Sequence, residues 1–378
     1  MQVYKCKNII TMNDNQPIID GFIGVENGRI AFIDSKNLGE SYIDYTDKII
    51  MPGLVNCHTH LAMVAFRGLA DDVPLYTWLE NYIFPREKEL TSDDIYKYSC
   101  DAIDECLAFG ATCVADMYLD ANAMHRACVY KNIRANICSQ GKKSDLIDTD
   151  KVKVDVGLHS VYTAEMEEIK SIEKLGNRTH IHISETLKEN DDCKAKYGVT
   201  PTKLLADLGF FDKKIYAAHC VYLENEDIGI FRDTNATVVH CPSANLKLAS
   251  GAAPIPHYLD NGINIALGTD GAASNNSLNM FAEIRIAALL HKGLTRNAEI
   301  IPAYAALKMA TINGAKALGR ENEIGSLEIG KQADFIVIDT SKPNMKPMNN
   351  AISAVVYQAN GSEVEQVYIS GEKYYESL

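Results

Sequence analysis

The sequence predicts a (β/α)8 barrel of the TIM type, together with a small β-sandwich domain built from both ends of the chain. Two observations lead to this fold class. Eight short apolar runs alternate with amphipathic segments through the middle of the chain, and β-rich segments occupy both ends. We therefore expect residues 53–321 to form the barrel, and residues 1–52 plus 322–378 to form the second domain.

Both ends of the chain carry short stretches in which β-branched and polar residues alternate. The N-terminal part contains VYKCKNIITM, IDGFIGVENGRIAFID and KIIM, and the C-terminal part contains DFIVID, SAVVYQA and VEQVYISGEKYY. Such alternation is typical of strands with one buried face. Glu26-Asn27-Gly28 interrupts the second stretch, and Asn-Gly is a strong hairpin signal. The stretches are therefore predicted to be strands of one small domain, with a turn at residues 26–28.

Eight apolar runs in the middle of the chain have the length of buried strands. They span residues 53–60, 111–118, 135–140, 154–160, 180–185, 215–220, 236–243 and 263–270. Amphipathic segments such as DDIYKYSCDAIDECLAFG and TPTKLLADLGF separate most of them, as the helices of a barrel would. A doubly wound open sheet is the alternative, but it would need a glycine-rich phosphate loop after the first strand, and none is present there.

The composition argues against some classes of binding partner and some cellular locations. The formal net charge of −13 argues against a nucleic acid or an acidic membrane surface, since both are bound through clustered Lys and Arg. The ten cysteines include no CxxC pair and are expected to be reduced thiols. The N-terminus is too polar for a signal peptide, and no apolar stretch approaches the ~20 residues that span a bilayer. A cytoplasmic location is the expectation that follows.

Histidine and aspartate residues stand at the carboxyl ends of several runs, which is the face where barrel enzymes carry their chemistry. His58 and His60 are two residues apart, so their side chains point to the same side of a strand. His182, His219 and Asp270 stand at or near the ends of the fifth, sixth and eighth runs. Imidazoles with a carboxylate suit Zn²⁺, which would lower the pKa of a water molecule toward ~7.

Longer motifs surround these residues. PGLVNCHTHLAMVAFRG, HIHISET, AAHC, HCPSANLKLASG and LGTDGAASNN resemble the amidohydrolase superfamily. They are most similar to the branch that deaminates 5′-methylthioadenosine, S-adenosylhomocysteine and related adenosines. The resemblance runs nearly end to end and includes IGSLEIGKQADFIVID near the C-terminus. It implies a metal-dependent hydrolase that acts on the C–N bond of a cyclic amidine.

The resemblance also implies roles for individual residues in catalysis. The implied metal ligands are His58, His60, His182 and Asp270. Glu185 would shuttle protons to the ring nitrogen, and His219 would orient or polarise the attacking water. Asp270 would both touch the metal and take the proton of the water. These roles agree with what hydrolytic deamination needs, namely a hydroxide, a proton donor and a base that recycles protons. His180 shares a strand face with His182 and is expected to pack deeper in the barrel.

Substrate contacts are implied in the same way. Trp78 and Glu87 lie in DVPLYTWLENYIFPREKEL, which resembles the substrate loop of the branch, and Glu87 would bind ribose hydroxyls. His159 in GLHSVYT matches a histidine that also reaches the sugar. Ser274, four residues after Asp270, matches a residue near the substrate.

Two absences refine the expected reaction. Binuclear relatives that open cyclic amides often bridge two metals with a modified lysine at the fourth strand, but that strand ends here in Gly157-Leu158-His159. One metal ion per subunit is therefore expected. Relatives that accept S-adenosylhomocysteine carry arginines between the third and fourth strands, and this stretch has none here. Lys142 or Lys143 offers only a point charge, so adenosines with small 5′ groups are favoured.

Other assignments stay open at this point. A free-base or triazine hydrolase of the guanine, cytosine or chlorotriazine type would use the same barrel and metal, and a non-catalytic scaffold would use the barrel alone. Zn²⁺ is the favoured ion, and Fe²⁺ or Mn²⁺ would accept the same ligands. A homo-oligomer, either a dimer or a tetramer, is expected, and the identity of the 5′ substituent is not fixed.

Overall fold

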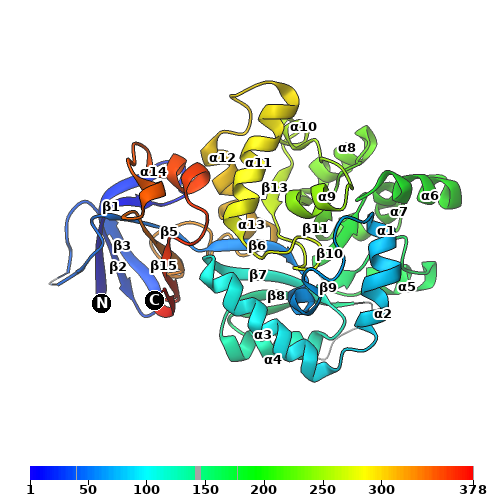
Figure 1. Cartoon of the computed structure of the whole chain (residues 1–378), viewed down its shortest axis with the longest axis horizontal. Helices are drawn as coiled ribbons and strands as arrows, with labels where there is room; N and C mark the ends of the chain where they lie inside the picture. The colour runs from blue at the N-terminus through cyan, green and yellow to red at the C-terminus, as the bar shows by residue number, and fades with distance from the viewer. Residues whose placement is uncertain (40, 141–145, 177, 378) are drawn as a thin grey trace. The chain divides into compact units, whose positions relative to one another are not determined.

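We describe the protein from a computed structural model, which covers residues 1–39, 41–140, 146–176 and 178–377. The chain divides into two compact units (Figure 1). The first comprises Met1–Asn56, Asp104–Cys113 and Asn279–Leu378, and the second comprises Cys57–Ile103 and Val114–Leu278. The domain expected from residues 1–52 and 322–378 falls within the first unit, and the boundaries proposed at residues 53 and 321 stay a prediction.

Eight strands form the barrel sheet, and they neighbour one another in the order of the chain. They are β6 (Leu54–Thr59), β7 (Ala111–Tyr118), β8 (Arg134–Gln140), β9 (Val152–Leu158), β10 (Arg178–Ile183), β11 (Lys214–His219), β12 (Thr237–His240) and β13 (Asn264–Leu267). Neighbours from β8 to β13 pair in parallel. Just beyond β13, the Asp270 N–H donates to the His58 carbonyl oxygen in β6 at 2.9 Å, so the sheet is nearly closed. The predicted barrel is confirmed.

Burial explains why these strands read as unbroken apolar runs. Every residue of β6 and of β7 is buried, as in parallel sheets that are covered on both faces. Helices connect the strands, as the amphipathic segments predicted. Those of the second unit are α1 (Leu75–Trp78), α2 (Phe84–Glu87), α4 (Ala121–Lys131), α5 (Met166–Glu173), α6 (Leu187–Tyr197), α7 (Pro201–Asp207), α8 (Asn225–Thr234), α9 (Pro242–Lys247) and α10 (Ile255–Asp260), and α3 (Ser92–Ala108) extends from the second unit into the first.

The second unit also contains two 3₁₀ helices and one π-helix among its described residues. They are the 3₁₀ helices η1 (Leu61–Phe66) and η3 (Phe210–Asp212) and the π-helix η2 (Leu79–Ile83), which joins α1 to α2. The helices of the first unit beyond α3 are α11 (Met280–Thr295), α12 (Ala303–Met309), α13 (Ile312–Ala317) and α14 (Ala351–Ser353), with the short η4 (Pro343–Met345) and η5 (Ala354–Gln358).

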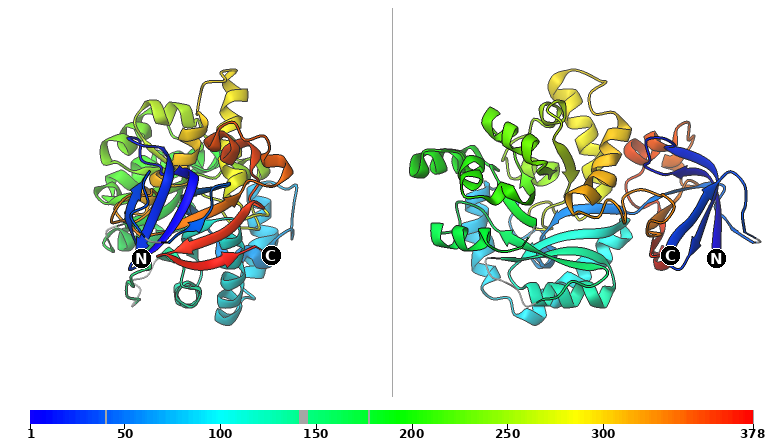
Figure 2. Two further views of the ribbon diagram at one scale, coloured as in Figure 1. Left: turned by 90° about the vertical axis from the view of Figure 1, so that its left-hand side faces the viewer. Right: turned by 180° about the vertical axis from the view of Figure 1, so that it is seen from behind.

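The two ends of the chain meet in a second sheet, whose order is β16-β15-β14-β5-β1-β2-β3, with β4 paired to β1 (Figure 2). The strands are β1 (Gln2–Ile10), β2 (Ile18–Glu26), β3 (Arg29–Asp34), β4 (Ile43–Asp44), β5 (Lys48–Pro52), β14 (Phe335–Asp339), β15 (Val364–Ile369) and β16 (Glu372–Glu376). One apolar cluster draws on strands from both ends of the chain, including Tyr4, Ile23, Phe335 and Tyr368. A β-domain built from both termini is therefore confirmed, and its strands run on as one eight-stranded sheet.

The predicted hairpin turn is confirmed in detail. Glu26 pairs with Arg29, which leaves Asn27 and Gly28 as a two-residue loop. Their φ angles are 50° and 76°, the left-handed values that a primed turn requires and that Asn and Gly adopt most readily.

One predicted strand is wrong. The segment SAVVYQA is helical, in α14 (Ala351–Ser353) followed by η5 (Ala354–Gln358). Asn350 begins this turn by accepting the Ser353 N–H through its side chain at 2.9 Å. Short apolar runs do not distinguish strand from helix by periodicity, and the capping asparagine decides this one.

Candidate active site

Five side chains of the types that bind metal ions converge at the carboxyl ends of the barrel strands. His58 and His60 come from β6, His182 from β10 and His219 from β11, and Asp270 follows β13. One ligand atom from each of His58, His60 and His182 lies within 4.8 Å of the others, and the same holds for His58, His219 and Asp270. The structure thus brings together every metal ligand that the motifs implied.

The second ring nitrogen of each histidine is held by the protein. Met117 O lies 2.5 Å from Nδ1 of His60, His159 O lies 2.6 Å from Nδ1 of His182, Asn245 Oδ1 lies 2.8 Å from Nδ1 of His219, and His180 Nε2 lies 2.8 Å from Nδ1 of His58. A carbonyl oxygen accepts only from a protonated nitrogen. In its neutral form, each ring held in this way turns an unprotonated Nε2 toward the common centre, as metal-binding histidines do.

This arrangement fits a divalent cation. His58 Nε2 is buried and makes no hydrogen bond to any residue that the structure describes. Nε2 of His60 and Nε2 of His182 lie 3.3 Å apart, so two lone pairs face each other when both rings are neutral and protonated at Nδ1. A cation shared by these nitrogens would satisfy them all, and nitrogen ligands with one carboxylate are a set that Zn²⁺ accepts.

Asp270 completes the set of ligands as an anion. Its Oδ1 lies 3.3 Å from Nε2 of both His58 and His60. Gly271 N–H and the Ser274 hydroxyl each donate to its oxygens at 2.8 Å. Burial alone would raise the pKa of Asp270, but the imidazole groups of His58 and His60, whose Nε2 atoms lie 3.3 Å from Oδ1, outweigh this effect and hold this pKa well below its usual value. Its φ of 62° is a left-handed conformation, as is common where a functional site imposes strain.

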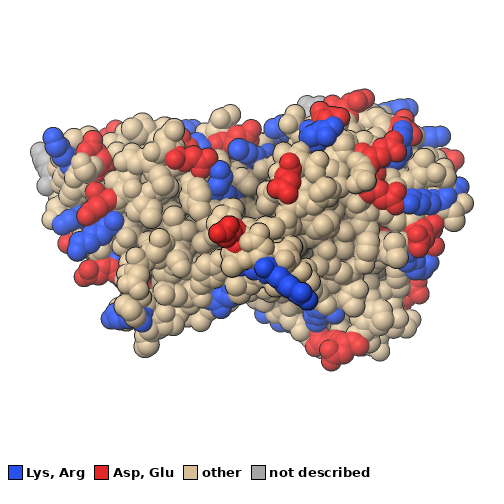
Figure 3. All heavy atoms as spheres, turned by 90° about the horizontal axis from the view of Figure 1, so that it is seen from above, with Lys and Arg blue, Asp and Glu red and all other residues tan. Residues whose placement is uncertain are grey.

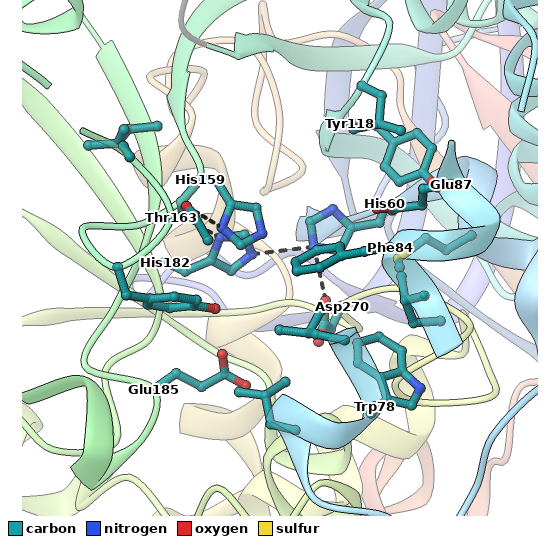
Figure 4. A pocket seen from close by; sticks show the side chains of 18 of the residues that line it. His60, Trp78, Phe84, Glu87, Tyr118, His159, Thr163, His182, Glu185 and Asp270 are labelled. Atoms are coloured by element: carbon teal, nitrogen blue, oxygen red, sulfur yellow. Dashed lines mark hydrogen bonds and ion pairs between the residues drawn. The ribbon is translucent and has the colours of Figure 1, made fainter. Parts of the chain in front are cut away.

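Glu185 stands just after β10 and lies below His182 in the view of Figure 4. Its Oε2 is 3.9 Å from His219 Nε2, and its Oε1 accepts a hydrogen bond from Ser250 at 3.3 Å. Burial raises the pKa of Glu185, so this carboxyl group takes up a proton more readily than an exposed glutamate. A carboxyl group of this kind is suited to carry protons.

A cavity of about 480 Å³ opens over the cluster, large enough for a nucleoside-sized molecule. Trp78, Glu87 and His159 line it together with His60, His182, Glu185, His219 and Asp270. Figure 4 shows Glu87 beside Tyr118 and away from Glu185, so the two glutamates face the cavity from different sides. Leu75, Leu79, Ile83 and Phe84 supply apolar walls.

Burial shifts the pKa values of two polar groups of the cavity, Glu87 and His159. Burial raises the pKa of Glu87, although the neighbouring Tyr118 opposes this shift. Burial, with the charges of nearby histidines, lowers the pKa of His159 to about 3, so its imidazole is neutral at pH 7. His159 Nδ1 lies 3.1 Å from Thr163 Oγ1, which helps to fix the ring. A neutral imidazole and a carboxyl group are both suited to sugar hydroxyls.

Ser274 is placed differently from the other predicted substrate residues. It is buried, and its hydroxyl donates to Asp270 Oδ2 and lies 3.0 Å from the Gly271 carbonyl oxygen. The structure therefore supports a contact between Ser274 and the metal-facing carboxylate. Contact with a substrate stays a prediction.

Sequence reasoning missed several residues that support this site. Asn245 holds His219, Ser250 holds Glu185, and Glu189 accepts the backbone N–H of Glu185 at 2.8 Å. Asn245 and Ser250 lie in HCPSANLKLASG, so the motif marked their segment but not their partners. His180 is fully buried, as expected, but it contacts the metal-facing His58 directly.

Barrel, histidine cluster and cavity together define a metal-dependent hydrolase of the amidohydrolase class. The chain matches the Amidohydrolase family over residues 49–373, and it belongs to this family. It is 42% identical to 5-methylthioadenosine/S-adenosylhomocysteine deaminase of Acetivibrio thermocellus, over 97% of this chain and 92% of that protein. It is 38% identical to 5'-deoxyadenosine deaminase of Methanosarcina acetivorans, over 98% of this chain and 91% of that protein.

A solved structure is similar over nearly the whole chain. It is that of an adenosine deaminase from Xanthomonas campestris with bound zinc, with a TM-score of 0.91 and 30% identity. The similarity covers 98% of this chain and 92% of the other. The family resemblance read from the motifs is thus confirmed.

Proposed function

We propose that this protein is a hydrolytic deaminase that replaces the 6-amino group of adenosine-type nucleosides by oxygen and releases ammonia. The observation that carries the proposal is the convergence of four imidazole nitrogens, Asp270 and Glu185 at one cavity. Adenine resists attack at C6 unless a nucleophile and a proton for the ring nitrogen arrive together. The site supplies groups for both tasks, and the named relatives carry out this class of reaction.

One divalent cation per subunit, with Zn²⁺ favoured and Fe²⁺ or Mn²⁺ as alternatives, would be held by His58, His60, His182 and Asp270. It would lower the pKa of a water molecule and so supply hydroxide at neutral pH. Asp270 takes the proton of the water. His219 Nε2 orients the attacking oxygen, because Asn245 fixes its ring from the other side. Glu185 gives its proton to the purine ring nitrogen. Asp270 then passes the proton that it took from the water to the leaving amine, and Glu185 takes the proton of the new C6 hydroxyl, so that ammonia leaves and both carboxyl groups return to their starting states.

The ribose would lie near Trp78, Glu87 and His159, which line the cavity. Glu87 accepts hydrogen bonds from the sugar hydroxyls, and the neutral His159 reaches the same group. The connection between β8 and β9 carries no arginine. Lys142 and Lys143, which would offer a positive charge in place of an arginine, lie outside the described residues. We therefore favour adenosines with small 5′ groups, such as 5′-methylthioadenosine and 5′-deoxyadenosine, over S-adenosylhomocysteine.

The alternative reactions have less support. Free bases and triazines would leave Glu87 and His159 without a sugar to hold. A non-catalytic scaffold is expected to lose metal ligands, but all of them are present and converge here.

Several further observations concern partners. On the face that Figure 3 shows, Lys and Arg are interspersed with Asp and Glu, which offers no continuous basic surface for a nucleic acid. Among the residues that the structure describes, no helix combines the length and apolar character needed to span a bilayer. A homodimer or homotetramer stays a prediction.

A deamination assay tests the proposal. The zinc-loaded protein would be incubated with 5′-methylthioadenosine, 5′-deoxyadenosine, adenosine, S-adenosylhomocysteine, adenine, guanine and cytosine, and the change in ultraviolet absorbance followed. We expect fast turnover of the 5′-substituted adenosines and no turnover of the free bases. Turnover of a free base alone would overturn the nucleoside assignment.

A further inference from the structure

A line of hydrogen bonds runs from the metal-facing His58 into the interior of the barrel. His58 Nδ1 lies 2.8 Å from His180 Nε2, and His180 Nδ1 lies 3.3 Å from Cys138 Sγ. Cys138 Sγ lies 3.5 Å from the Tyr216 hydroxyl, which donates to Asp155 Oδ2 at 2.9 Å. All five side chains are buried. The line thus connects a metal-facing imidazole to a buried carboxylate on another strand.

The far end of this line is firmly held. Asp155 accepts hydrogen bonds from Asn136 Nδ2 at 2.7 Å and from the Arg178 guanidinium at 3.1 Å, in addition to that from Tyr216. The guanidinium balances the charge of the carboxylate, so Asp155 acts as a fixed acceptor in the barrel interior.

The direction of each hydrogen bond follows from this acceptor. Tyr216 gives its one proton to Asp155, so the thiol of Cys138 donates to the tyrosine oxygen. His180 Nδ1–H then donates to the sulfur, which leaves His180 Nε2 unprotonated. Burial raises the pKa of the Cys138 thiol and of the Tyr216 hydroxyl well above their usual values, which keeps both protons in place.

His58 differs from the other histidines of the cluster in the group that faces its Nδ1. His60, His182 and His219 each face a carbonyl or amide oxygen, which can only accept. The partner of His58 is an imidazole, whose nitrogen accepts in one tautomer and donates in the other. His58 presents a free Nε2 to a cation only if His180 keeps the accepting tautomer.

We propose that His180, Cys138, Tyr216 and Asp155 are positioning residues that fix the Nδ1-protonated tautomer of His58 and thereby raise the affinity of the site for its cation. The inference rests on the metal site of the proposed function. Hydrogen-bonded partners of this kind typically change metal affinity by about 10–100-fold.

Zinc affinity, measured by competition with a chelator, tests this inference without an activity assay. In H180L the acceptor is lost, and we expect zinc to bind about 10–100-fold more weakly. In H180Q the amide oxygen stands where Nε2 stood, so affinity should stay within about threefold of the parent. Y216F removes the link to Asp155 and should weaken binding about three- to tenfold, as one lost hydrogen bond would.

The matched control is H291L, which removes a buried imidazole on α11, outside this line. Circular dichroism of each metal-free variant checks that it folds. The d–d spectrum of the cobalt-loaded proteins should shift in H180L and stay near the parent in H180Q. Equal zinc affinity in H180L and the parent, or equal weakening in H180L and H180Q, would overturn the inference. A parent protein that binds no zinc would instead overturn the proposed metal site.

Discussion

The carboxyl group of Glu189 holds the backbone of Glu185, because its Oε2 accepts the Glu185 N–H at 2.8 Å. Its other oxygen accepts the N–H of Ser184 at 3.0 Å, and Ser184 has a left-handed φ of 51°. This strained turn carries Glu185 out of β10 toward the cavity. Burial raises the pKa of Glu189 to about 8, although these backbone donors oppose the shift.

We predict that E189Q lowers kcat about tenfold, because Glu185 would be less well placed to transfer its proton. A tenfold fall corresponds to an activation free energy that is about 1.4 kcal/mol higher. The NH₂ group of the new amide would face one of the two backbone N–H groups, which would then lack an acceptor. The free energy of unfolding should therefore fall by about 1–3 kcal/mol. Steady-state kinetics and denaturant unfolding measure the two effects. D191N, on the exposed face of the same helix, is the control. A kcat equal to that of the parent would show that Glu185 needs no such support.

Glu185 itself is the strongest test of the proton path. We predict that E185Q abolishes measurable turnover, with a fall of at least about 10²–10⁴-fold, since a positioned acid–base group typically contributes this much. Its metal content should stay at the parent level, because Glu185 lies outside the implied ligand set. Metal analysis of the purified variant and a sensitive ammonia assay give the two readouts. Retained turnover would remove Glu185 from the mechanism.

Much of the barrel could be predicted because parallel strands that are buried on both faces are apolar throughout. The run at 236–243 was predicted too long, since β12 (Thr237–His240) ends before Pro242, where a helix begins. The prediction of a strand at SAVVYQA was wrong for a related reason, because an apolar run of that length is compatible with either a strand or a helical turn.

The sequence allowed the grouping of the candidate site residues to be predicted, but not the hydrogen-bond partners that hold them. Side chains at strand ends converge because the barrel brings those ends together, so His58, His182 and Asp270 could be grouped in advance. The partner of each ring nitrogen follows no spacing rule. Asn245, for example, lies in α9 after β12 and meets the ring of His219 at the end of β11.

Ser274 offers a test that separates two roles. Its hydroxyl donates to Asp270 Oδ2, so we predict that S274A lowers kcat about 10–100-fold and leaves KM unchanged, since a hydrogen bond to a charged group contributes about 1.5–3 kcal/mol. Initial-rate kinetics with 5′-methylthioadenosine would measure both constants. A rise in KM alone would indicate that Ser274 touches the substrate instead.

Glu87 should act on the sugar and not on the base. We predict that E87A raises KM for 5′-deoxyadenosine about 10–100-fold, because the ribose hydroxyls lose a charged acceptor worth about 1.5–3 kcal/mol. The same variant and the parent should have similar KM values for 2′,3′-dideoxyadenosine, which lacks those hydroxyls. An equal loss with both nucleosides would assign Glu87 to the cavity wall in general.

His291 on α11 (Met280–Thr295) makes stability depend on pH. Burial lowers its pKa from 6.5 to about 4, so on acidification the unfolded chain takes up this proton before the folded chain does. The contribution of His291 to the free energy of unfolding is therefore fully present above pH 6.5 and is lost as the pH falls toward 4. We predict that the parent loses roughly 1–3 kcal/mol more than H291L over this range, given 1.36 kcal/mol per pKa unit. Urea unfolding of both proteins at pH 7.5, 6, 5 and 4.5 measures the difference, and parallel pH profiles would show that His291 titrates alike in the folded and unfolded chains.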